Sequence, residues 1–135
     1  MNLRRAGAVA ALLGLAAATG CGIGRAEHGD TVSYDVGDPV TALEVGTDAG
    51  SIRIVGSDRQ GVHVTENLSW GGDRRPETRH AVRDGALVLD HTCPGGWGGL
   101  LHCDVSYTIE IPRGLRVRAG TDSGQLTLRG LAGAV

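Results

Sequence analysis

The sequence contains no phenylalanine and no lysine, and its only large aromatic residues are two tryptophans and two tyrosines. A core built on aromatic rings is therefore excluded, and Val, Leu, Ile and Ala must supply most of the buried surface. Without lysine, and with a formal net charge of −2 over 135 residues, the chain lacks the basic surface of a nucleic-acid-binding protein. We expect no nucleic-acid partner.

Long apolar runs are also scarce, and the one that stands out lies near the N-terminus. It runs from Ala6 to Ala18 behind the pair Arg4 and Arg5, and it is too short to span a hydrocarbon core of about 30 Å. A positively charged N-terminal segment followed by a short apolar run is typical of a secretory signal peptide, which we predict over residues 1–20. The arginine pair leaves both general secretion and twin-arginine export open.

The sequence has three cysteines, an odd number for an exported protein. The segment Ala17–Cys21 resembles a bacterial lipobox, although alanine stands at position 18 where leucine is commoner. That resemblance implies that Cys21 becomes a lipidated N-terminus, and Cys93 and Cys103 then remain as a pair. An ordinary signal peptide followed by a chance cysteine is the alternative.

Residues 21–40 are predicted to form the lipidated cysteine and a flexible tether, because this stretch is rich in Gly and Asp and shows no sustained periodicity. A flexible chain of this length spans roughly 25 Å. The sequence shows no basic cluster that would bind anionic lipid. We therefore expect anchoring to the outer face of the bacterial cell membrane through the acyl chains alone.

The rest of the chain, residues 41–135, alternates short apolar–polar–apolar runs with turn signals rich in Gly, Asp and Ser. This period of two is typical of half-buried strands and predicts an all-β domain. Strands are expected at residues 43–45, 52–54, 62–64, 86–93, 103–111, 115–117 and 125–128.

An internal repeat supports this prediction. Residues 46–56 align without gaps with residues 120–130, and each copy contains a Thr-Asp-small-Gly turn between two strands. Leu43 and Leu115 begin a Leu-x-Val segment before each copy, and aspartate and glycine are residues that favour such turns. Stacked copies would bury an aliphatic ladder, so we expect a short-strand β-solenoid-like repeat domain. A small β-sandwich is the alternative.

Cys93 and Cys103 are predicted to staple an antiparallel hairpin by a disulfide, as export favours. If the two cysteines face each other, one face of the hairpin becomes apolar and the other polar, and a slip of one residue would destroy this segregation. Closing the loop would contribute about 2.5–3 kcal/mol. The register pairs His91 with Val105, Leu89 with Tyr107, and Leu87 with Ile109.

Two metal sites were weighed against structural roles. A zinc site of His91, Cys93, His102 and Cys103 conflicts with strand geometry, because adjacent residues point to opposite faces. Calcium at the repeat turns would have one carboxylate from each copy, Asp48 or Asp122, which is too few. We expect no metal and no other cofactor, and we expect the two aspartates to cap their turns.

No catalytic motif accompanies the five histidines of the chain. A nucleophile elbow, a zinc-binding His-Glu-x-x-His helix, a phosphate-binding loop and a redox Cys-x-x-Cys are all missing from the sequence, so we expect no enzyme. Trp70 and Trp97 each adjoin a Gly-Gly pair and are the candidates for ligand contact. The alternative is that each ring covers an end of the aliphatic core.

The segments Leu43–Gly56, Ala86–Leu89 and Tyr107–Gly130 resemble a bacterial adhesin-like β-strand repeat family of unknown function, also labelled auto-transporter adhesin, head-region-like. The resemblance covers residues 41–135. It implies an exported or membrane-attached protein with a β-solenoid, and it transfers no catalytic residues. Members of that family usually continue through more repeats, so we expect either a truncated chain or an open end that another copy or a partner covers.

The function predicted from these features is that of a cell-envelope lipoprotein with a non-enzymatic, adhesin-like binding or structural domain. Its partners would be the membrane, through the N-terminal lipid, and a component of the cell wall or another protein. An accessory or sensor subunit of an envelope-stress system is the alternative function, and an exported hydrolase is a third.

Overall fold

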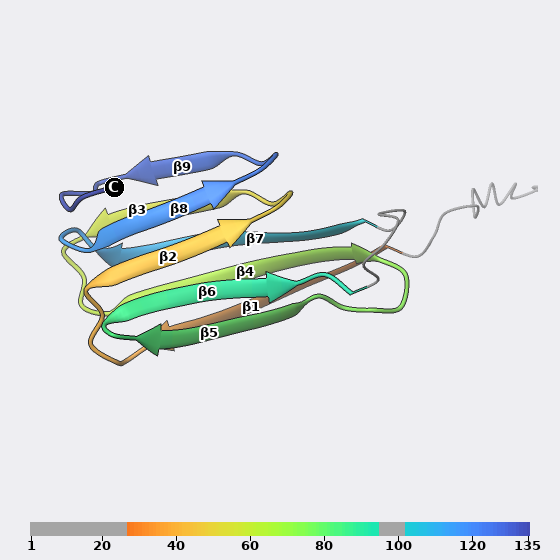
Figure 1. Cartoon of the computed structure of the whole chain (residues 1–135), viewed down its shortest axis with the longest axis horizontal. Coiled ribbons are helices and arrows are strands. Elements are labelled where there is room, and N and C mark those ends of the chain that lie inside the picture. Colours follow the sequence, from red (N-terminus) through yellow and green to blue (C-terminus); the bar gives the residue numbers. More distant parts are fainter. Residues whose placement is uncertain (1–26, 95–101) are drawn as a thin grey trace, which may run out of the picture.

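The computed structural model describes residues 27–94 and 102–135, which form nine β-strands (Figure 1). No helix of these segments is long and apolar enough to cross a membrane. The strands are β1 (Glu27–Val36), β2 (Ala42–Thr47), β3 (Ile52–Ser57), β4 (Val62–Gly71), β5 (Glu77–Arg83), β6 (Ala86–Thr92), β7 (Cys103–Pro112), β8 (Arg116–Thr121) and β9 (Leu126–Arg129).

The strands form two sheets that lie face to face as a sandwich (Figure 1). One sheet has the order β1-β4-β7-β3-β9 and the other the order β5-β6-β2-β8. The predicted all-β class is confirmed, and the sandwich alternative describes the architecture. Among the described residues the strands do not form a solenoid, because three of the seven strand pairs are antiparallel.

Alternating apolar residues build the core between the sheets. In β3, for example, Ile52 and Ile54 are buried while Arg53 between them is exposed, as a strand with one covered face requires. Of the sixteen buried hydrophobic residues in the described segments, only Tyr107 is aromatic. The aliphatic core expected from the composition is therefore confirmed.

The two copies of the repeat stack directly on each other. β2 pairs with β8 and β3 with β9, both parallel, so that Gly46 lies beside Gly120 and Ile52 beside Leu126. The stacking predicted from the repeat is confirmed for these two copies. In this register Val117 lies beside Leu43, because Leu115 stands two residues further from its turn than Leu43 does.

The disulfide between Cys93 and Cys103 is present, with 6.1 Å between the Cα atoms. The predicted antiparallel hairpin is wrong. β6 pairs with β5 and β2, whereas β7 belongs to the other sheet, between β4 and β3. The disulfide therefore joins the ends of strands in different sheets.

The physical reason lies in the alternation itself. Leu87 and Leu89 of β6 and Tyr107 and Ile109 of β7 are all buried in one core. Two strands paired in one sheet show an apolar–polar alternation that buries one face of that sheet. Two strands that face each other from opposite sheets of a sandwich show the same alternation. The pattern therefore identified the inward residues correctly without showing which strands are hydrogen-bonded.

The tether predicted for residues 21–40 is wrong over residues 27–36, which form β1 and pair antiparallel with the whole of β4. Only the end of this strand contributes to the core, through Tyr34 and Val36. The alternation is thus confined to a few residues. The rest of the strand is exposed apart from the partly buried Val32. β5, which was not expected, is another edge strand, and it carries four ionisable side chains in seven residues.

Candidate functional site

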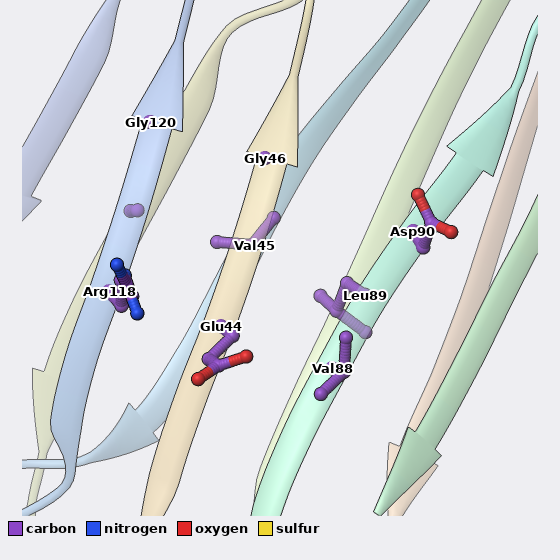
Figure 2. Close-up of a pocket in the computed structure, with 9 residues that line it drawn as sticks. Glu44, Val45, Gly46, Val88, Leu89, Asp90, Arg118 and Gly120 are labelled. Carbon is purple, nitrogen blue, oxygen red and sulfur yellow. The ribbon is translucent and has the colours of Figure 1, made fainter.

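The outer face of the four-stranded sheet carries a hollow of about 390 Å³ (Figure 2). Gly46 and Gly120 form its floor, and the side chains of Glu44, Asp90 and Arg118 stand around it. We call this hollow the trough. The side chains of Val45 and Leu89 lie behind the sheet in Figure 2, toward the core.

The strand register explains why the sheet is hollow at this place. Glu44 of β2 lies between Val88 of β6 and Arg118 of β8, so this row of the face is filled by side chains. Two residues further along, Gly46 lies beside Gly120, and neither contributes a side chain. The parallel stacking of the two repeat copies therefore places bare backbone beside a row of charged groups.

The fold does not require glycine at these two positions. A Cβ atom on Gly120 would meet no atom within 4 Å, and one on Gly46 would lie at an ordinary 3.8 Å from the Gly120 carbonyl oxygen. Neither residue is among those with positive φ. Glycine inside a strand costs roughly 0.5–1 kcal/mol relative to alanine. The two glycines thus leave space above the sheet at a small cost in stability.

The trough continues past the ends of β2 and β8 into a second hollow of about 420 Å³, which Asp48, Asp122 and His91 line together with Asp90. Hydrogen bonding to the Arg79 guanidinium, at 3.2 Å, holds the pKa of the exposed Asp90 carboxyl below its usual range. This stretch of surface therefore presents carboxylates to a ligand, together with exposed backbone. Such groups accept hydrogen bonds from hydroxyl, amide and cationic groups.

The described residues contain no group of three or more His, Cys, Asp or Glu side chains that could hold a metal ion. The sulfur atoms of Cys93 and Cys103 are joined to each other, so they are not thiolate ligands for the zinc site that was considered. His102, the fourth member of that site, lies 3.1 Å from the Asp104 carboxylate instead.

In the second repeat turn the side chain of Thr121, and not that of Asp122, makes the hydrogen bond that closes the turn. The Thr121 hydroxyl accepts a hydrogen bond from the Gly124 N–H at 3.0 Å and donates one to the Gly50 carbonyl at 2.9 Å. The capping role predicted for Asp122 is therefore filled by Thr121. Threonine precedes aspartate in both copies, and hydroxyl side chains are known to bond to nearby backbone in turns.

Sequence reasoning missed a buried polar cluster between the sheets. Glu66 of β4 is only 1% exposed; its Oε1 accepts a 2.6 Å hydrogen bond from the Tyr34 hydroxyl, while its Oε2 has no partner. Burial, followed by the influence of Glu66, raises the pKa values of Tyr34 and Tyr107 above their ordinary range. His80 stacks on Tyr34 at 4.2 Å, and His91 lies 3.4 Å from the Tyr107 hydroxyl.

A signal for this cluster was present in the sequence. Val62, Val64, Glu66 and Leu68 occupy every second position of one strand, so the glutamate stands at an inward position. A carboxyl group buried in this way needs a hydroxyl or cationic partner. Tyr34 supplies it from β1, which lies within the stretch predicted to be a tether.

Trp70, one of the two predicted ligand contacts, lies near the end of β4, half-buried and packed against the core. Its ring stacks on His28 at 5.5 Å, and the Arg75 guanidinium lies 5.9 Å from the ring centroid. The ring thus covers one end of the core, as the alternative role required, and its contact with a ligand stays a prediction. Trp97 and Cys21 lie outside the described residues.

No family model matches the sequence, and no curated protein matches it. A similar fold occurs in a crystal structure described as that of a "putative cell adhesion protein" from Clostridium sporogenes ATCC 15579, with a TM-score of 0.50 and 15% sequence identity. The match covers 75% of this chain and 51% of that one, so this chain spans about half the length of that protein. At this identity the similarity shows the fold alone.

Proposed function

We propose that this protein is a non-enzymatic, adhesin-like surface-binding domain of the bacterial cell envelope and that it binds its target in the trough. The observation that carries the proposal is the pair Gly46 and Gly120. Their lack of side chains serves no need of the fold, and it opens a hollow beside Glu44, Asp90 and Arg118. Surface binding explains why two strand positions with room for a side chain have none.

The setting of the trough supports this function. It lies on paired strands of a sandwich, and a rigid scaffold holds binding groups more precisely than loops do. The disulfide between Cys93 and Cys103 fits a protein that leaves the reducing cytoplasm. The similarity in fold to a protein described as a putative cell adhesion protein agrees with an adhesin-like role.

Filling the trough tests this function. Gly120→Val places the Cβ atom of a β-branched side chain in open space, and Gly46→Val places it at an ordinary van der Waals distance, so both variants should fold about as stably as the parent protein. The panel consists of immobilised fibronectin, collagen, peptidoglycan and arrayed glycans. We expect beads coated with the parent protein to be retained on at least one of these surfaces. We expect the double variant to lose about tenfold or more of that retention, equal to roughly 1.4 kcal/mol.

Thr108→Val is the matched control, because Thr108 lies in the other sheet, on the face turned away from the core. It introduces the same side chain at a distance from the trough, and retention should be unchanged. Retention that is equal in the parent protein and the glycine double variant would contradict the proposal, as would a panel to which the parent protein does not bind.

The proposed anchor is a lipid on Cys21, with the domain held at the outer face of the cell membrane. The lipobox-like segment Ala17–Cys21 supports it, as does the pairing of the two other cysteines in a disulfide. We expect Cys21→Ala to move the protein from the membrane fraction to the soluble fraction, because the remaining surface has no basic cluster for lipid binding. Fractionation followed by immunoblotting measures this, and Ser33→Ala serves as the neutral control. Membrane attachment that survives Cys21→Ala would contradict the anchor.

A further inference from the structure

β8 and β9 are the last strands of their sheets, and they end the sandwich on the same side (Figure 1). We call this side, residues 116–129, the open edge. Leu126 is 41% exposed there and is one of two exposed large hydrophobic residues among those described. Ala119 and Leu128, also directed toward the core, are only partly buried. The core therefore reaches solvent at the open edge.

The interface of β8 and β9 with β2 and β3 indicates which kind of partner the open edge can bind. The second repeat unit, residues 116–129, rests on the first, residues 42–57, and the hydrogen bonds that residues 121–123 donate all run toward the first unit. The Thr121 hydroxyl donates to the Gly50 carbonyl at 2.9 Å. The Asp122 N–H donates to the Thr47 carbonyl at 3.2 Å, and the Ser123 N–H to the Asp48 carbonyl at 3.0 Å. In these three contacts the donors belong to the second unit and the acceptors to the first. Where β3 begins, the Ile52 N–H donates in the other direction, to the Gln125 carbonyl at 2.9 Å.

The first unit makes a similar contact with β7, the neighbour of β3 on the side away from the open edge. There the Thr47 hydroxyl donates to the Val105 carbonyl at 2.8 Å. The threonine hydroxyl of each Thr-Asp-small-Gly turn thus donates away from the open edge, and the first turn offers the carbonyls of Thr47, Asp48 and Gly50 toward it. In the second unit the carbonyls of Thr121, Asp122 and Gly124 correspond to the acceptors of the first. The open edge therefore continues the interface between the two units by one further step.

We propose that the open edge is the docking site for a partner that presents a strand–turn–strand unit with a Thr-Asp-small-Gly turn. The incoming threonine hydroxyl would donate to the Gly124 carbonyl, and its strands would extend both sheets beyond β8 and β9. Backbone pairing at a sheet edge supplies affinity, and the side chains at alternate positions supply specificity. This site shares Arg118, Ala119 and Gly120 of β8 with the trough. Its test measures folding stability and not target binding, so the two proposals can fail independently.

Charge narrows the choice of partner. In the existing interface Arg118 lies beside Glu44, and Arg129 lies beside the uncharged Val55. β8 and β9 carry three arginines, including Arg116, and no acidic residue. Two open edges brought together would oppose like charges, which destabilises strand pairs. The partner unit should therefore carry an acidic residue beside Arg118 and resemble the first unit rather than the second.

The C-terminal residues leave this site accessible. The Val117 N–H donates to the Ala134 carbonyl at 2.9 Å, so residues 131–135 cover the beginning of β8. Among the described residues no strand pairs with the far side of β8 or β9 beyond that point. Docking is therefore expected to begin beside Arg118, directly after the covered Val117, and to reach across the turn to Leu128.

A tethered copy of the first unit tests the proposal in the full chain. A second copy of residues 42–57 is appended to Val135 through a flexible linker, which gives an effective concentration in the millimolar range, on the order of 1 mM. The probe is compared with an otherwise identical extension in which the appended threonine is replaced by valine and the appended glutamate by arginine. Urea unfolding measures the folding equilibrium of each protein.

We expect the matched extension to raise the folding equilibrium constant about tenfold over the altered extension. Leu126→Lys should abolish that gain, measured against its own unextended parent, while Gln125→Lys, next to it on the outer face, should preserve it. Equal unfolding midpoints for the two extensions would overturn the proposal, and so would a gain that survives Leu126→Lys. A concentration-dependent dimer of the unextended chain that Leu126→Lys abolishes would overturn the choice of partner in favour of a second copy.

Discussion

Gly124→Ala is expected to destabilise the domain by about 3 kcal/mol or more, which makes it one of the most damaging single-methyl substitutions in the molecule. A methyl group on Gly124 would overlap the carbonyl oxygen of Gly50 and crowd the Thr121 hydroxyl. Both neighbours belong to the stacked turns, and two backbones in parallel register cannot separate without breaking the ladders between β2 and β8 and between β3 and β9. Urea denaturation followed by circular dichroism measures the loss.

Gly120→Ala is the matched control for this prediction. It adds the same methyl group four residues earlier, where no atom lies within 4 Å. Because alanine restricts the unfolded chain more than glycine does, this variant should be as stable as the parent or more stable by up to about 1 kcal/mol. Equal stability of Gly124→Ala and Gly120→Ala would show that the turns are not stacked as closely as the structure has them.

One repeat thus contains glycines that the fold requires and glycines that it does not require. The sequence shows glycine at positions 46, 50 and 56 and again at 120, 124 and 130, and sequence reasoning assigned all six to turns. The structure requires glycine at Gly50, Gly56, Gly124 and Gly130, where backbones approach closely, but not at Gly46 and Gly120. Turn propensity could not separate the two groups, because the difference depends on what the neighbouring strand places above each residue.

Much of the fold could be predicted because it depends on local alternation. Each strand with a full inward-facing stripe, such as β3 with Ile52 and Ile54, was found from its period of two. The repeat also gave the correct neighbours for β2 and β3. β1 and β5 were not predicted, because an edge strand needs few apolar residues. Its backbone hydrogen bonds do not produce a recognisable pattern of side chains.

Long-range pairing was the other limit, as β6 and β7 show. The prediction placed Leu89 beside Tyr107 in one sheet, whereas the two residues lie in the core from opposite sheets. A disulfide restrains the distance between its cysteines and is compatible with strands in one sheet or in two. The trough could not be predicted for the same reason, since it forms only when β2, β6 and β8 become neighbours.

Removal of the disulfide is the second prediction with a large effect. Cys93→Ser combined with Cys103→Ser should destabilise the domain by about 2.5–3 kcal/mol, because a closed loop of this size removes that much entropy from the unfolded chain. The crosslink also joins β6 to β7, which share no backbone pairing. Its loss should therefore loosen the contact between the sheets near Tyr107 and His91, whose side chains lie 3.4 Å apart at that end of the core.

Unfolding of the double variant in urea, compared with the parent protein before and after reduction, measures this effect. The reduced parent should match the double variant, since both lack the crosslink and keep every other residue of the core. The near-ultraviolet circular dichroism signal, to which Tyr107 contributes, should weaken in both proteins. The far-ultraviolet β-sheet signal should remain. A double variant as stable as the oxidised parent, or free thiols at Cys93 and Cys103 in exported protein, would show that the two sheets hold together without this bond.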